Sequence, residues 1–364
     1  MAAAVRSVAL GRRWSRLPGP VRLVAALALI AFFFILPLLK IPILNTPQSD
    51  FPSVLFYPVG TFVLIAIGLD IVVGRAGLLD LGYVAFFAVG GYTVALLGTK
   101  AHWTFFVILP VAIIVSMLAG VLLGGPTLRL RGDYLAIVTL GFGEIIRITA
   151  RNTKFLGADQ GISSIPHPAD IRLPGAHLHF GILDPKPYYW VLLTFIIAII
   201  VVVIRLEHSR VGRAWTAIRE DEDAAELMGV PTYKFKVWAF ALGAGVAGMA
   251  GTLFAAKVTF INPENYPFEL SILFLAAVVL GGSGNLPGAI LGAIVVAYLP
   301  ERFRFLNQYR VLIFGATLVI MMIFRPQGLL PARRRAAELA DRDMPGGSAG
   351  GALGAEVISG GDDA

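Results

Sequence analysis

The sequence contains no cysteine, and charged residues are scarce. Without cysteine the chain can form neither disulfides nor thiolate metal sites, although this absence does not identify a compartment. Only 15% of the 364 residues are charged, whereas a soluble domain has about one quarter. The chain also lacks the pattern Gly-x4-Gly-Lys-[Ser/Thr], in which backbone N–H groups hold the phosphates of a nucleotide. The sequence therefore predicts no cysteine chemistry, no nucleotide site of this kind and no enzymatic activity of its own.

Hydrophobic residues dominate what is present, with 57% of the chain and a mean hydropathy of +0.78. This composition is typical of a protein that crosses a membrane several times. A net charge of +7 would suggest a nucleic-acid partner in a soluble protein. Here the basic residues cluster in short loops and tails, so membrane topology explains them and we expect no nucleic acid.

The apolar runs predict an all-α bundle of about ten transmembrane helices, because a spanning helix needs roughly 20 mostly apolar residues. Three of the runs are short or interrupted by glycine, so nine or eleven spans are possible. The first run follows several arginines like a signal peptide, but it is long and lacks a clean cleavage site, so we interpret it as a retained span. The candidate spans are 21–39, 53–73, 78–98, 103–123, 133–149, 188–205, 237–258, 268–282, 287–300 and 309–324.

Ten spans would put both termini on one side of the membrane. The majority of the 30 Lys and Arg residues then share the side of the basic tail 1–22 and of loop 206–236, which predicts that both termini are cytoplasmic. Residues 23–330 form the predicted transmembrane domain, and the Gly- and Ala-rich tail 331–364 is predicted to be disordered.

Loop 150–187 is predicted to lie outside the membrane. Its histidines and an aspartate could suggest a metal site, but His-x-His suits a strand and the loop has no regular strand pattern. We interpret the loop as a solvated segment that contacts a partner, and we predict no metal there. The residues concerned are His167, Asp170, His177 and His179.

A polar segment over 213–229 gathers acids, bases and a helix stop within the predicted cytoplasmic loop. Gly229 can adopt the left-handed conformation that ends a helix, and Pro231 prevents a restart. Acids near the end of one long helix would face the negative end of its dipole, so two short helices are favoured, the second opening near Asp221. Asp223 and Glu226 have the spacing of a capping box. Our candidate contact residues are Arg213, Glu220, Asp221, Asp223, Ala224, Ala225 and Gly229.

Several residues inside the predicted spans are candidates for the pathway or for helix packing. Gly245 and Gly248 belong to a glycine-rich span, and small residues let helix backbones approach closely. Glu144 precedes Arg147 by three residues, so the two can pair on one helix face. Gly282 and Asn285 lie in a glycine-rich break that is either a turn or a re-entrant element whose backbone could contact an amino acid.

Four segments, in order, resemble the LivM-type permease family of branched-chain amino-acid ABC importers. In addition, Asp223-Ala-Ala-x3-Gly229 resembles the Glu-Ala-Ala-x3-Gly loop of ABC importer permeases, although Asp replaces Glu and the downstream Ile-x-Leu-Pro is missing. The resemblance runs from about 55 to 330 and rests on residues 68–92, 130–147, 281–292 and 324–330.

The resemblance implies an importer-type ABC permease in a bacterial inner membrane, forming half of a pathway for Leu, Ile and Val. It also implies a second, LivH-like permease, two cytoplasmic ATPases that use ATP and dock on segment 213–229, and an external solute-binding protein. No cofactor would be bound by this chain. Two alternatives stay open: a sister importer for urea, short amides or other amino acids, and an ion-coupled secondary carrier in which Glu144 would titrate.

Overall fold

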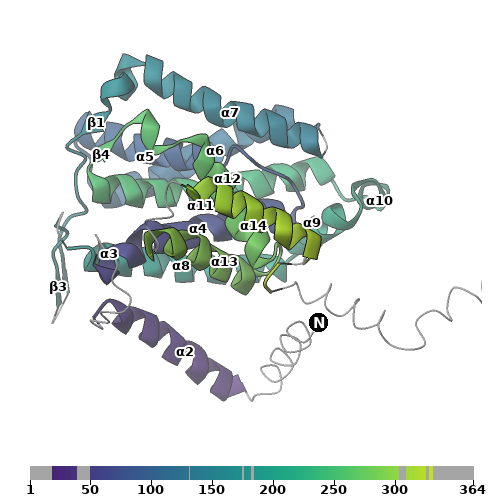
Figure 1. Ribbon diagram of the computed structural model, residues 1–364, viewed down its shortest axis with the longest axis horizontal. Helices are drawn as coiled ribbons and strands as arrows, with labels where there is room; N and C mark the ends of the chain where they lie inside the picture. The colour runs from purple at the N-terminus through teal and green to yellow at the C-terminus, as the bar shows by residue number, and fades with distance from the viewer. Residues whose placement is uncertain are drawn as a thin grey trace, which may run out of the picture.

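The computed structural model describes residues 19–38, 50–130, 132–173, 176–181, 184–302, 309–324 and 328–330. Most of the predicted N-terminal tail and all of the predicted tail 331–364 lie outside these residues. Helices make up most of the described chain, and they run roughly side by side in one bundle (Figure 1). Helix α2 (Gly19–Ile35) lies at the edge of the bundle, where the carbonyl oxygens of Phe33 and Phe34 accept from Tyr189 Oη and Trp190 Nε1, both at 3.1 Å, and it is followed by η1 (Leu36–Leu38).

The remaining helices follow the predicted order. The first long rod, from Phe51 to Arg75, combines α3, η3, α4 and η4, with bounds Phe51–Val54, Leu55–Gly60, Thr61–Leu69 and Asp70–Arg75. Next come α5 (Val84–Thr99), α6 (Phe105–Thr127), α7 (Asp133–Asn152), η5 (Lys154–Leu156) and η6 (Ala158–Gln160). They are followed by α8 (Lys186–Glu207), α9 (Arg210–Glu220), α10 (Glu222–Leu227), α11 (Thr232–Val258), η7 (Pro263–Asn265), α12 (Phe268–Gly281), α13 (Leu286–Arg302) and α14 (Arg310–Phe324).

Five helical segments of the described chain are long and apolar enough to cross a membrane: Phe51–Arg75, Phe105–Thr127, Lys186–Glu207, Thr232–Val258 and Pro263–Gly281. Each of the ten predicted spans coincides with a helix, but the other helices are shorter or less apolar. The coarse prediction of a helical membrane protein is therefore supported, and the number of ten crossings stays a prediction.

Helix α11 forms the centre of the bundle, packed against α4, α5 and α6. The glycines of α11 allow the neighbouring helices to approach its backbone closely. A Cβ at Gly251 would lie 1.9 Å from the carbonyl oxygen of Phe87, and one at Gly248 would lie 2.0 Å from Ser116 Oγ. At Gly245 a Cβ would lie 2.8 Å from Met117 Cγ. These close approaches place Gly245 and Gly248 in the contact between α6 and α11, and a role in the pathway stays a prediction.

The predicted span 78–98 differs from the structure at its start, because α5 begins only at Val84. Residues 76–83 are irregular rather than helical, and they pack against helices. Leu81 N donates to Thr139 Oγ1 at 3.0 Å, and Tyr83 Oη donates to the carbonyl of Gly243 at 2.6 Å. Asp80 is fully buried and accepts from Gly82 N at 2.9 Å. Irregular backbone at this depth is tolerated where protein buries it, and here it joins α5, α7 and α11.

The loop after α7 contains strands that the sequence analysis did not anticipate, so the all-α description is incomplete. Strand β1 (Ile162–Ser163) pairs with β4 (Phe260–Ile261), and β2 (Ile171–Leu173) pairs with β3 (Ala176–Leu178), both antiparallel. The expectation that this loop has no strand is wrong. Strand β1 pairs with a distant segment, which leaves no local pattern, and β2 and β3 have only three residues each, which is too short for a clear alternation. His179 Nδ1 lies 2.9 Å from Asp170 Oδ2, and no metal-ligating group of three side chains occurs among the described residues.

Candidate functional site

The polar segment is two helices, as the placement of its acids predicts. Ser209 caps α9, its Oγ accepting from Val211 N at 3.1 Å. The chain is extended at Asp221, whose Oδ1 accepts from Ala224 N at 3.0 Å and caps α10. The capping residue is thus Asp221. Asp223 lies within the first turn of α10, so the capping box expected between Asp223 and Glu226 is wrong.

Gly229 ends α10 as expected. Its φ is +82°, and Gly229 N donates to the carbonyl of Glu226 at 2.9 Å. The next amide, Val230 N, donates to the carbonyl of Ala225 at 3.0 Å. This bond completes a C-terminal cap of α10 in which Gly229 has the left-handed conformation. A Cβ at Gly229 would meet no atom within 4 Å, so backbone conformation rather than crowding favours glycine here.

Helix α9 is anchored to the bundle through one face. Trp215 is 1% exposed, and its Nε1 donates to the carbonyl of Phe235 in α11 at 2.8 Å. Ile218 and Ala214 are buried beside it. Arg213 is exposed on another face and donates to the nearby carbonyl of His208 at 3.3 Å. Apolar residues that recur at helical spacing therefore fix α9 against the start of α11.

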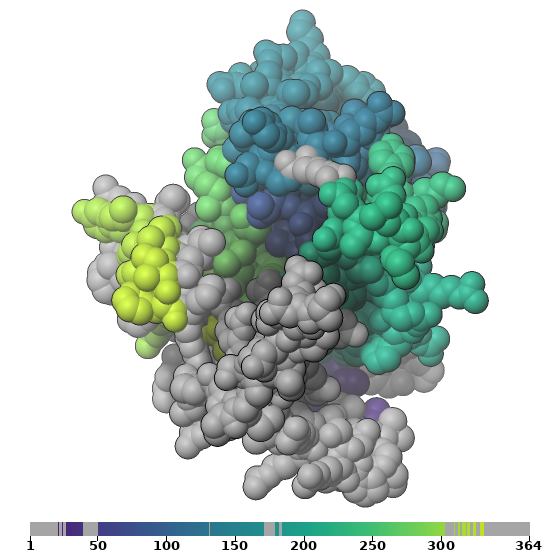
Figure 2. Space-filling model, turned by 90° about the vertical axis from the view of Figure 1, so that its right-hand side faces the viewer, coloured from purple at the N-terminus to yellow at the C-terminus, as the bar shows by residue number. Residues whose placement is uncertain are grey.

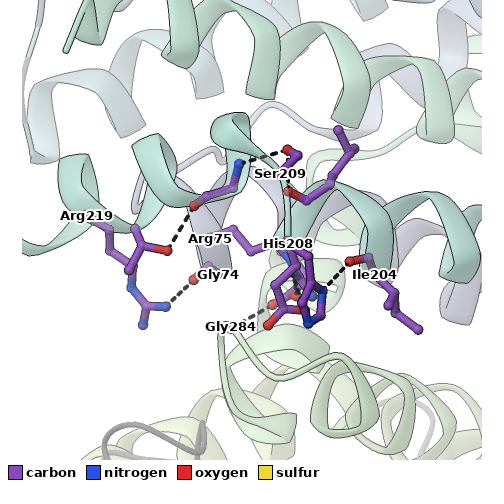
Figure 3. A network of polar contacts seen from close by, with 12 residues as sticks. Gly74, Arg75, Ile204, His208, Ser209, Arg219 and Gly284 are labelled. Atoms are coloured by element: carbon purple, nitrogen blue, oxygen red, sulfur yellow. Dashed lines mark hydrogen bonds and ion pairs between the residues drawn. The ribbon is translucent and has the colours of Figure 1, made fainter.

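A polar network joins the end of α9 to the end of the first long rod (Figure 3). The Arg219 guanidinium donates to the carbonyl of Gly74. Arg75 lies between two acids, with Nη1 3.0 Å from Glu207 Oε2 and Nε 3.5 Å from Asp70 Oδ2. Asp70 is fully buried, so its charge depends on these contacts. Helices α8 and α9 and the segment η4 are consequently held together at one end of the bundle.

The glycine-rich break between α12 and α13 belongs to the same network. Gly284 N donates to Asp70 Oδ1 at 2.7 Å, and a Cβ at Gly284 would collide with the Arg219 guanidinium. Asn285 Nδ2 donates to the carbonyl of Leu330 at 3.0 Å, and Gly282 has φ of +112°. The break is a turn at the end of the bundle that carries α9. A role of this turn in contacting an amino acid stays a prediction.

Helix α10 projects from this end of the bundle (Figure 1). Lys236 is 2% exposed and binds Glu222, which ties the start of α10 to α11. At the other end of α10, Leu227 and Met228 are 88% and 85% exposed. Figure 2 looks onto this end, where α9, α10 and the start of α11 form the green surface on the right.

Sequence reasoning missed this exposed pair, because Ala214, Ile218, Ala225 and Met228 recur at near-helical spacing, which favours one shared apolar face. Ala225 is buried, whereas Met228 follows the last residue of α10 and points elsewhere. The break at Asp221 changes the helical phase, which explains the error. Among the other candidates, Glu220, Asp221, Asp223 and Ala224 are exposed around the same break. The segment thus presents an apolar tip and acids on a rigid base, which suits contact with another protein.

Glu144 and Arg147 pair on α7, as their spacing predicts. Arg147 Nε donates to both carboxylate oxygens of Glu144, at 3.0 and 3.1 Å. The side chains are 35% and 26% exposed. Helix α7 lies along a different part of the molecule from α9 and α10, and Gly245 and Gly248 lie in the contact between α6 and α11, so the candidate residues do not form one site (Figure 1).

A bundle of apolar helices with a projecting polar segment at one end defines a multi-pass membrane protein that can receive a partner. The family described as the permease component of the branched-chain amino acid transport system matches residues 53–322. The chain belongs to this family.

Individual relatives agree with this membership. The high-affinity branched-chain amino acid transport system permease protein LivM of Salmonella typhimurium is 43% identical over 302 residues, covering 78% of this chain and 71% of the relative. LivM of Escherichia coli is 44% identical over 290 residues, covering 75% and 68%. LivH of Salmonella typhimurium is 25% identical over 285 residues, covering 74% and 91%. No solved structure matches the chain.

Proposed function

We propose that the chain forms half of the translocation pathway of an ATP-driven importer for branched-chain amino acids. The similarity to LivM over most of the chain carries this proposal. The second half would be a LivH-like permease, since both subunits bear the same family resemblance to this chain. Apolar cargo asks little charge of a pathway, which fits the scarcity of charged residues in the helices.

We further propose that α9 and α10 form the surface on which the ATPase docks. ATP hydrolysis by the two ATPase subunits would act on the pathway through this surface. Leu227 and Met228 would enter a cleft of an ATPase subunit, each contributing about 1.5–3 kcal/mol when fully buried. Through Trp215 and Arg219, movement of this tip would reach α11, η4 and the turn before α13. ATP would be bound by the partner subunits, and this chain would carry no nucleotide or cofactor.

The membrane orientation follows from the same proposal. If α10 meets a cytoplasmic ATPase, the ends of α8 and α12 and the start of α11 face the cytoplasm. The strands β1 and β4, at the opposite end of the bundle, then face the external solute-binding protein (Figure 1). We propose ten crossings of a bacterial inner membrane with both termini cytoplasmic, because this arrangement places most basic residues inside.

Reconstitution of the importer in vesicles tests the proposal. With the second permease, both ATPases and a loaded binding protein, we expect leucine uptake that needs internal ATP. The chain alone in ATP-free vesicles with an imposed ion gradient should show none. Gradient-driven uptake by the chain alone would instead establish a secondary carrier. ATP-driven uptake of urea or amides without uptake of Leu, Ile or Val would establish a sister importer.

A further inference from the structure

We propose that α7 carries a contact site for the transported amino acid, formed by Glu144 and Arg147 with the hydroxyls of Tyr92 and Tyr266 behind them. The ligand class is a zwitterionic α-amino acid with an apolar side chain. This inference rests on the proposed import function and deepens it by naming residues of the pathway.

Helices α6 and α7 are neighbours, and each exposes a long face that no other described part of the chain covers. Helix α6 contains no charged residue, and it exposes apolar side chains such as Leu118, at 61%. Helix α7 exposes Ile137 and Ile145 but also contains Glu144 and Arg147 well inside its length. Glu144 lies roughly 12 Å before the end of the helix at 1.5 Å per residue. Lipid suits the face of α6, whereas charges at this depth favour a water-filled path.

The two glycines of α7, Gly141 and Gly143, have different surroundings. Gly143 lies on the packed side of α7, where its Cβ would be 3.3 Å from Gly82 Cα. A Cβ at Gly141 would meet nothing within 4 Å. Gly141 precedes Glu144 by three residues and Ile145 by four, so all three share one helix face. The open space at Gly141 therefore lies beside the charged pair, outside the packing of the chain itself.

The charged pair matches the two charges of an amino acid. The cargo carboxylate can accept from Arg147 while its ammonium donates to Glu144, so both protein charges stay paired when the ligand replaces their mutual contact. Partial exposure of both side chains leaves them accessible for this exchange. The apolar side chain of the cargo would lie along Ile145 and into the space at Gly141.

Arg147 shares a small pocket with two buried tyrosines. Arg147 lines a small pocket between α5, α7 and the residues after η7, together with Tyr92 and Tyr266. Both tyrosines are buried, at 6% and 2% exposed, and neither hydroxyl has a hydrogen-bond partner in the described chain. A buried hydroxyl without a partner is unfavourable. The pocket has room for a group the size of one water molecule, and a carboxylate oxygen that accepts from these hydroxyls would satisfy them.

Cysteine labelling tests whether the exposed face of α7 is accessible to water. Because this chain contains no cysteine, no native cysteine has to be replaced in it first. In the assembled importer we expect the Gly141→Cys variant to react with a membrane-impermeant thiol reagent. Leucine delivered by the binding protein should slow this reaction severalfold. The Leu118→Cys variant on α6 is the matched control and should not react. Absence of labelling at Gly141→Cys, or a rate that leucine leaves unchanged, would overturn the proposal.

Conservative variants test the contacts themselves. We expect Arg147→Gln and Glu144→Gln each to lower leucine uptake about tenfold or more, and Tyr92→Phe with Tyr266→Phe to raise the leucine concentration needed for half-maximal uptake. Subunit assembly and basal ATP hydrolysis should persist. Arg151→Gln is the control on the same helix, because Arg151 is half exposed and pairs with Asp159 at 2.8 Å near the helix end. Uptake at the unaltered rate in assembled Glu144→Gln and Arg147→Gln importers would contradict the inference.

These outcomes separate the two proposals. If the unaltered importer carries no Leu, Ile or Val, the proposed function fails. If it carries them and the α7 variants carry them equally well, only the inference about α7 fails.

Discussion

Helices α9 and α10 follow one another at Asp221, yet the chain holds them differently. Helix α9 buries Trp215 against α11 and extends Arg219 to the carbonyl of Gly74. Helix α10 is tied mainly at its start, through Glu222, and exposes its apolar end. The difference indicates that contact with the ATPase and transmission of its movement to the bundle are tasks of different helices. Under the proposed function, the exposed end of α10 would contact the ATPase, and the anchored helix α9 would pass the movement to the bundle.

The largest expected effect comes from the tie between α10 and α11. Lys236 has a side chain only 3% exposed, and Glu222→Gln would leave its charge without the carboxylate. Removing one partner of a buried pair costs about 3–5 kcal/mol, and the partial exposure of Glu222 places this case toward the lower end. We expect a lower temperature of unfolding of the purified permease pair. The double variant Glu222→Gln with Lys236→Met should recover most of the loss, and equal losses in both would contradict a buried pair.

Next in size is the link from α9 to η4. Arg219→Gln removes a charged donor from the carbonyl of Gly74, a contact typically worth about 1.5–3 kcal/mol. We expect ATP hydrolysis to continue while leucine uptake per ATP falls about tenfold. A tenfold change corresponds to about 1.4 kcal/mol, which is close to the lower end of the value of this contact. Arg210→Gln is the matched control, because Arg210 is exposed at the start of α9 and is not one of the candidate contact residues, and this variant should behave like the unaltered protein. Equal uptake per ATP in both variants would remove Arg219 from the transmission path.

A smaller effect is expected at the end of α10. Gly229 has φ of +82°, so Gly229→Val would strain the backbone by about 1–2 kcal/mol without any collision. We expect weaker ATPase binding, because the exposed tip loses its fixed position. Gly229→Asn should bind nearly normally, since asparagine tolerates the left-handed conformation. If the Gly229→Val and Gly229→Asn variants bind the ATPase equally well, the cap at Gly229 does not position the exposed end of α10.

The smallest effect is expected at the cap of α10. Asp221→Ala removes the oxygen that accepts from Ala224 N, and such losses cost typically about 1 kcal/mol. A severalfold weaker binding of the ATPase should result, measured by titration of the purified permease pair. Asp221→Asn keeps an acceptor oxygen and should bind like the unaltered protein. A strong defect in Asp221→Asn would point to the charge rather than the cap.

Local patterns in the sequence were enough to predict the helices, the stop at Gly229 and the pairing of Glu144 with Arg147. Each depends on residues a few positions apart, where helical geometry decides the outcome. The break near Asp221 could also be predicted, because acids at the wrong end of a helix are unfavourable.

Contacts between distant segments could not be predicted. Asp70 accepts from Gly284 across 214 residues, and Ile162 of β1 pairs with Ile261 of β4, 99 residues further along the chain. Lys236 illustrates the same limit. It counted among the basic loop residues, yet the fold buries it beside Glu222. The exposure of Leu227 and Met228 also depends on how α10 leaves the bundle, which no periodicity within six residues encodes.

The most direct test of the account is ATPase binding by a tip variant compared with a base variant. With Leu227→Asp and Met228→Asp combined, we predict that affinity of the permease pair for its ATPase subunits falls about 100-fold or more, since each buried side chain contributes about 1.5–3 kcal/mol. The Arg219→Gln variant should bind the same subunits with unaltered affinity. Unaltered ATPase affinity in the Leu227→Asp and Met228→Asp variant would contradict the separation of contact from transmission.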